Sequence, residues 1–152
     1  IVNVIERKEA VVFFNNDMYE VLDSDGVILS IKQNYEGLSS FPLLVGKDAP
    51  TNINALLAIV NEIGSYQSEV LYYEWIGERR WDIHMKSELV FKLPENNLNE
   101  GLKVMCMFLR ETDKLLKTVV SVDLRNIDKP IIRFRKAPPV EYLGKNIRRL
   151  AG

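Results

Sequence analysis

Two amphipathic helical patterns, separated by strand-like runs, constrain the fold of this chain most. In each pattern, apolar residues recur every three or four positions, the spacing that gives a helix one buried face. The first pattern predicts a helix over residues 52–65, with Thr51 as its N-cap and Gly64 as its terminator. A chain with this pattern must place a helix against another apolar surface.

Short β-prone runs surround the helical patterns and supply that surface. The second helical pattern begins at Asn97, which with Glu100 three residues later has the form of a capping box, and its apolar face continues to Leu116. Strands are predicted over residues 2–5, 10–14, 19–22, 27–31, 70–76, 80–85, 88–93, 118–125 and 131–135. Residues 32–50 have no sustained period, and we expect an irregular connection there. The pattern as a whole predicts an α+β fold, a mostly antiparallel sheet with two principal helices packed against it.

Length and composition limit the classes of function. A chain of 152 residues forms one main core, which buries roughly 70% of the unfolded surface. The formal net charge of −1 gives no general attraction to nucleic acid or to anionic lipid. The single cysteine, Cys106, allows no internal disulfide, and its place in a helical apolar pattern favours a small buried side chain over a nucleophile.

No residue pattern indicates a catalytic centre, a metal site or a cofactor site. His84 is the only histidine, and in a strand it lies on the opposite face from Ile83 and Met85. The run Asp23-Ser24-Asp25-Gly26 begins like a calcium loop, but Asn34 occupies the twelfth position and the glycine comes too early, so we expect a hairpin turn. We therefore expect no enzymatic activity, no cofactor and no metal.

The last predicted strand has the features of a sheet edge. Pro130 precedes it, and a proline lacks the N–H that an internal strand needs, so prolines stand at strand starts or on edges. An open edge can accept a strand from a second protein. Alternatively, the charges of Arg133 and Arg135 serve only to block aggregation, and the residues leave both possibilities open.

Five segments, in their order along the chain, resemble the FtsQ/DivIB cell-division family. The resemblance covers residues 1 to about 136, and it rests on Val4-Ile5-Glu6-Arg7, Asp23-Ser24-Asp25-Gly26-Val27, Phe41-Pro42-Leu43-Leu44-Val45-Gly46, Arg79-Arg80-Trp81-Asp82-Ile83 and Val122-Asp123-Leu124-Arg125. It implies that residues 1–7 are the terminal strand of a truncated POTRA domain. Residues 8–137 would be the β domain of the family, and residues 138–152 a C-terminal tail.

The resemblance also implies a function and a location. Members of the family are non-catalytic scaffolds of the divisome, the protein assembly that builds the septum in bacterial cell division. Their β domain binds FtsB and FtsL, and a segment of FtsB adds as a strand to the sheet edge. The parent protein would then be a single-pass protein of the cell inner membrane, anchored by one N-terminal helix, with this region in the periplasm.

Carried over residue by residue, the resemblance implies a partner-binding site near the end of the chain. Either Arg79 or Arg80 would pair with an acidic side chain of FtsB. The remaining site residues would flank or form the pairing edge: Arg125, Asn126, Ile131, Ile132, Arg133 and Phe134. Two departures bear on this edge, because Asn126 stands where family members often carry tyrosine and Pro130 removes one backbone donor.

Two other functions are open at this stage. A POTRA-associated chaperone module for outer-membrane proteins would bind many peptides of alternating pattern, and an unrecognised hydrolase would need a pocket with clustered acids or bases. The scaffold hypothesis predicts that glutamate at Arg79 or Arg80, or proline at Ile132, weakens binding of an FtsB-type peptide. In each variant the far-ultraviolet circular dichroism should remain unchanged.

Overall fold

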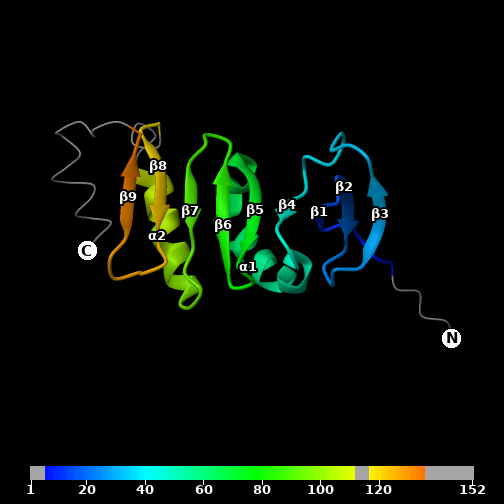
Figure 1. Cartoon of the computed structure of the whole chain (residues 1–152), viewed down its shortest axis with the longest axis horizontal. Helices are drawn as coiled ribbons and strands as arrows, with labels where there is room; N and C mark the ends of the chain where they lie inside the picture. The colour runs from blue at the N-terminus through cyan, green and yellow to red at the C-terminus, as the bar shows by residue number, and fades with distance from the viewer. Residues whose placement is uncertain (1–5, 112–116, 136–152) are drawn as a thin grey trace.

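A nine-stranded sheet organises the whole molecule in the computed structural model, which describes residues 6–111 and 117–135. The strands follow the order β3-β2-β1-β4-β5-β6-β7-β8-β9 along the long axis of Figure 1. Their bounds are β1 Val11–Asn15, β2 Met18–Leu22, β3 Ile28–Lys32, β4 Leu43–Val45, β5 Val70–Ile76, β6 Arg80–Met85, β7 Val90–Lys92, β8 Val119–Asp123 and β9 Ile131–Phe134.

Two α-helices lie on one face of this sheet (Figure 1). Helix α1 covers Ile53–Ile63 and is flanked by the short 3₁₀ helices η1, Ala49–Asn52, and η2, Gly64–Glu69. Helix α2 covers Leu98–Glu111. Their apolar faces pack in one hydrophobic cluster with side chains from every strand except β3. The largest fully buried side chains of this cluster are Tyr73, Phe91 and Phe108. The α+β class predicted from the sequence is therefore confirmed.

Each helix connects two neighbouring strands that run parallel. Helix α1 lies between β4 and β5 in the chain, helix α2 lies between β7 and β8, and both strand pairs are parallel. A parallel pair needs such a crossover, because a tight turn cannot reverse the chain twice. Of the eight strand pairings among the described residues, five are antiparallel and three parallel, so the sheet is mixed with an antiparallel majority.

The expected irregular connection over residues 32–50 is wrong at its centre. Strand β4 lies there, parallel to both β1 and β5. The strand is only three residues long, too short to give a period, and its pairing partners are far away in the sequence. Residues 35–41 cover the opposite face of β1 and β2, where Val12, Val21 and Leu38 form a second small buried cluster.

The helix ends predicted from the sequence are confirmed in part. Gly64 ends α1 with a positive φ of 55°, as predicted. Thr51 is not the N-cap of α1, since its hydroxyl donates to the Asp48 carbonyl oxygen at 2.6 Å and helix η1 precedes α1. The expected strand over residues 2–5 and the expected end of the second helix, to Leu116, lie outside the described residues.

The Asp23-Ser24-Asp25-Gly26 run forms the turn between β2 and β3. One Asp23 carboxylate oxygen accepts the backbone N–H groups of Asp25 and Val27 at 2.9 and 2.8 Å. The other accepts a hydrogen bond from Arg7 at 2.5 Å. The Arg7 guanidinium and the two backbone donors together hold the pKa of Asp23 below its usual range.

This depressed pKa predicts an acid-dependent loss of stability. A carboxyl group whose pKa is lower in the folded state stabilises the fold above its unfolded pKa and loses this contribution as the pH falls through its folded pKa. Asp23→Asn keeps a side-chain oxygen that can accept the turn N–H groups but removes the charge. The variant should therefore have a lower free energy of unfolding than the wild type at neutral pH, and this gap should close as the pH falls below about 4. Urea unfolding against pH measures the gap, and the exposed neighbour Asp25→Asn is the control. A gap that stays constant with pH would contradict the assignment.

Candidate partner-binding edge

Strand β9 is the outermost strand at one end of the sheet among the described residues. It pairs with β8 in antiparallel register, with Asp123 opposite Ile131 and Val122 opposite Ile132. Figure 1 shows β9 beyond β8 at the end of the sheet, away from β3. The sequence places this strand correctly, and the edge position that Pro130 suggested is observed.

The side chains of β9 alternate between the two faces. Ile132 and Phe134 are half-buried and pack against the main core. Ile131 and Arg133 point to the opposite face, where no α-helix lies, and Ile131 is 63% exposed. An exposed isoleucine beside an exposed arginine gives this edge both an apolar and a cationic contact.

The backbone of β9 presents groups to the open side at two positions. The Arg135 N–H donates to the Thr118 carbonyl oxygen at 2.7 Å, so the Arg135 backbone faces β8. Backbone groups alternate in direction along a strand, and those of Ile132 and Phe134 therefore face away from β8. By the same alternation Pro130 also faces away, so its missing N–H shortens the open edge and leaves the pairing with β8 intact.

The connection between β8 and β9 is fixed by its own polar groups. Arg125 binds the Asp123 carboxylate through Nε, at 2.9 and 3.0 Å, and through Nη2, at 2.6 Å. This bidentate pair lowers the pKa of Asp123 and raises that of Arg125. The Asn126 side chain accepts the Asp128 N–H at 3.2 Å, which makes Asn126 a turn-forming residue.

The two candidate arginines lie on and beside β6, three strands away from β9. Arg79 is exposed in the turn between β5 and β6, where its N–H donates to the Ile76 carbonyl oxygen at 3.2 Å. Arg80 begins β6, and its Nε donates to the Asp82 carboxylate at 3.2 Å. With strands spaced about 4.8 Å apart, β6 and β9 are separated by roughly 14 Å. The structure therefore brings together the candidates at β8 and β9 but places both arginines apart from them.

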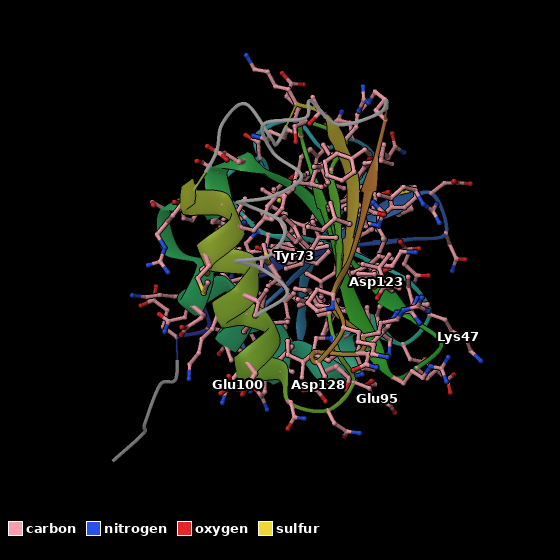
Figure 2. All side chains as sticks on the ribbon, turned by 90° about the vertical axis from the view of Figure 1, so that its left-hand side faces the viewer. Lys47, Tyr73, Glu95, Glu100, Asp123 and Asp128 are labelled. Atoms are coloured by element: carbon pink, nitrogen blue, oxygen red, sulfur yellow. The ribbon has the colours of Figure 1, made fainter. Side chains whose placement is uncertain are left out.

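A continuous polar row joins these two regions across the open face, which is the sheet face without α-helices. Glu74 on β5 pairs with Asp82, Asp82 with Lys92 on β7, and Lys92 with Asp123. Figure 2 shows Asp123 on the side of the sheet opposite to α2, which carries Glu100. The carboxylates of Asp82 and Asp123 belong to this row, and they are further candidate site residues that the sequence analysis missed. Their signal was the spacing Arg80-x-Asp82 and Asp123-x-Arg125, which puts both members of each pair on one face of a strand.

His84 and Glu74, also on this face, contact each other. His84 lies 2.7 Å from the Glu74 carboxylate and stacks on Tyr72, with 4.3 Å between ring centroids. Among the residues that the structure describes, no group of three His, Cys, Asp or Glu side chains could hold a metal ion. None of the helices in that same part of the chain has the length and apolar character needed to cross a bilayer.

Comparison with known proteins places the chain in a family. Residues 10–125 match the family model "Cell division protein FtsQ/DivIB, C-terminal". A Rhizobium radiobacter protein named cell division protein FtsQ is 33% identical over 111 residues, covering 73% of this chain and 52% of that protein. A Zymomonas mobilis protein of the same name is 28% identical over 146 residues, covering 95% of this chain and 46% of that protein.

A solved structure gives a further likeness. The major extracytoplasmic domain of the DivIB cell-division protein from Geobacillus stearothermophilus, in its trans isomer, aligns with 72% of this chain and 100% of its own length. Its TM-score is 0.49 and its sequence identity 12%. The chain spans about half the length, or less, of the curated relatives described above. On the match of the family model over residues 10–125, the chain belongs to the FtsQ/DivIB family of cell-division proteins.

Proposed function

We propose that this chain is a non-catalytic scaffold of the divisome that captures an extended segment of an FtsB/FtsL-type partner by strand addition to β9. The observation that supports the proposal most is the position of β9 at the end of the sheet, with the backbone groups of Ile132 and Phe134 directed outward. An incoming strand would continue the sheet and bury the exposed Ile131 side chain.

The side chains around the edge define the chemistry of the partner. A strand beside β9 would place alternate residues on the two faces, so we expect apolar side chains next to Ile132 and Phe134. On the open face we expect an acidic side chain next to Arg133. A single strand there lies about 19 Å from β6, four strand spacings away, so contact with Arg79 or Arg80 requires a second part of the partner to cross the open face.

The location of the chain follows from the same proposal. We propose that residues 8–137 form the β domain of a protein anchored in the inner membrane by a single helix, with this domain in the periplasm. Residues 1–7 would then belong to a preceding POTRA domain, and residues 138–152 would form a tail. Family membership in cell division supports this arrangement.

Proline at Ile132 tests strand addition directly. Ile132→Pro removes an outward-facing N–H and adds a ring at the edge, while the pairing with β8 remains. We expect affinity for a peptide of the FtsB segment encoded by the same genome to fall at least about tenfold, which corresponds to about 1.4 kcal/mol. Isothermal titration calorimetry gives the affinity, and circular dichroism checks the fold.

The opposite edge of the sheet provides the matched control. Ile31 on β3 is also exposed at the end of the sheet. The Asp23 N–H donates to the Val27 carbonyl oxygen, and alternation along β2 then turns the backbone of Glu20 away from β3, so its register partner Ile31 faces outward too. Ile31→Pro should bind the peptide like the wild type. Equal weakening by both prolines, or by neither, would refute a specific role for β9, and binding of many unrelated alternating peptides would favour a chaperone function instead.

A further inference from the structure

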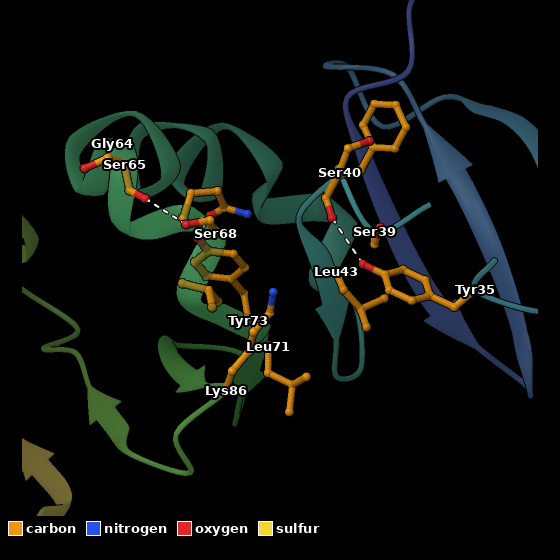
Figure 3. A pocket seen from close by; sticks show the side chains of 13 residues that line it. Tyr35, Ser39, Ser40, Leu43, Gly64, Ser65, Ser68, Leu71, Tyr73 and Lys86 are labelled. Carbon is orange, nitrogen blue, oxygen red and sulfur yellow. Dashed lines mark hydrogen bonds between the residues drawn. The ribbon is translucent and has the colours of Figure 1, made fainter. Parts of the chain in front are cut away.

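A cavity interrupts the sheet where β4 is too short to fill the space between β1 and β5. Strand β4 pairs with β5 only at Tyr73 and Glu74, so the first residues of β5, Val70–Tyr72, have no neighbour on that side among the described strands. The cavity of about 440 Å³ lies there and is shown in Figure 3. Its volume falls within the range of about 300–1,000 Å³ that is typical of small-molecule sites.

Hydroxyl and amide groups converge on this cavity from two separate segments. One wall is the loop before β4, and the other is η2 together with the start of β5, as Figure 3 shows. The polar lining consists mainly of Ser39, Ser40, Ser65, Gln67, Ser68 and Lys86. Apolar side chains, including the exposed Leu71, complete the lining. This combination of an apolar surface and a few polar groups characterises ligand sites.

Internal hydrogen bonds determine which polar groups remain for a ligand. The buried Tyr73 hydroxyl donates to the Gln67 side-chain oxygen, so the polar group left on Gln67 is its amide nitrogen, a donor. Ser68 donates to the Ser65 carbonyl oxygen at 3.1 Å. Ser39 and Ser40 make no side-chain hydrogen bond within the described part of the chain. The groups left over are therefore donors or hydroxyls, and an acceptor-rich ligand fits them.

The charge of the lining is positive. Among the described residues that line the cavity, Lys86 is the only ionisable one apart from two tyrosines, and none carries a carboxylate. Within residues 6–110 and 117–135, no acidic side chain lies within ion-pair distance of Lys86. The Lys86 backbone N–H donates to the Glu69 carbonyl oxygen at 2.8 Å, which anchors the residue beside η2. An ammonium group without an ion-pair partner in these ranges favours an anion at a donor-rich cavity.

We propose that this cavity binds a small hydroxylated carboxylate of the sugar-acid class. Its carboxylate would face Lys86, and its hydroxyls would exchange hydrogen bonds with Gln67 and the serine hydroxyls. The cavity lies beside β4 and β5, apart from β9. The ligand proposal can therefore be tested independently of the strand-addition proposal.

Titration of the isotope-labelled chain with D-glucuronate tests the site by NMR. We expect saturable shifts of the backbone amides of Ser39, Ser40 and Leu71, with a dissociation constant of about 1 mM, as for a weak small-molecule site. Lys86→Gln should weaken binding at least about tenfold, because a charged hydrogen bond is lost. Lys32→Gln, on exposed β3, is the matched control and should bind like the wild type.

Two further probes separate the parts of the proposal. Neutral D-glucose should bind at least about tenfold more weakly than glucuronate, for the same electrostatic reason. Inorganic phosphate should not reproduce the shifts, because it lacks the sugar hydroxyls. Absence of saturable shifts with glucuronate, equal binding of glucose, unchanged binding by Lys86→Gln, or the same shifts with phosphate would each overturn the assignment.

Discussion

Gly46→Ala is expected to lower the free energy of unfolding by about 3 kcal/mol or more, through backbone strain and overpacking together. Gly46 follows β4 with a φ of 108°, a conformation that alanine rarely adopts. A Cβ atom there would lie 2.3 Å from the Trp75 carbonyl oxygen. That oxygen belongs to the backbone of β5, so relief of the clash would shift the pairing of Val45 with Glu74.

Gly37→Ala separates the two causes. Gly37 has a φ of 78°, but a Cβ atom there would meet no heavy atom within 4 Å. Its substitution should cost about 1–2 kcal/mol, from the left-handed backbone alone. Urea unfolding followed by circular dichroism measures both variants. An equal loss of stability in the two would show that the close approach of Gly46 to β5 contributes nothing.

Local sequence patterns predict most elements of this fold because most of them are determined locally. Helix α1 follows from its apolar spacing and Gly64, and the turn between β2 and β3 follows from Asp23 and its neighbours. Strand β4 could not be predicted, since its three residues carry no period and its order comes from β1 and β5. The requirement for glycine at position 46 could not be predicted either, because Gly46 approaches Trp75 closely only once β4 and β5 pair.

For the candidate site, too, the sequence predicts some features and not others. Pro130 and the charged residues after it predict an edge strand from sequence alone, and β9 is found at the end of the described sheet. The distance between Arg80 and that edge depends on the order of β6, β7, β8 and β9, which the crossover through α2 determines. No spacing along the chain encodes this order. Direct partner contacts of the two arginines therefore stay a proposal.

Arg80→Ala is expected to destabilise the fold by about 2–4 kcal/mol at neutral pH, in contrast to Arg79→Ala. The Arg80 side chain is only 13% exposed, and its guanidinium pairs with Asp82, which is 3% exposed. Burial raises the pKa of the Asp82 carboxyl, and the hydrogen bond from Arg80 opposes this shift. Removal of Arg80 would leave a buried carboxylate without its cation. Arg79, exposed in its turn, should change stability by less than about 0.5 kcal/mol.

The pH dependence of this loss identifies its cause. A carboxyl group whose pKa is raised in the folded state favours folding when it is protonated, so the deficit of Arg80→Ala should shrink as the pH falls from about 7 toward the folded-state pKa of Asp82. The double variant Arg80→Ala with Asp82→Asn should recover most of the stability at neutral pH, because no buried charge remains. Urea unfolding over a series of pH values from neutral to acidic measures the first effect, and urea unfolding at neutral pH measures the second.

The same comparison decides how the two arginines can be tested in partner binding. Arg80→Glu would place a second carboxylate beside buried Asp82, so weaker binding by that variant would mix loss of contact with loss of fold. Arg79→Glu changes only an exposed turn and reports on contact alone. If Arg80→Ala proves as stable as Arg79→Ala, the pairing with Asp82 is not structural, and Arg80→Glu becomes an equally direct test of contact with the partner.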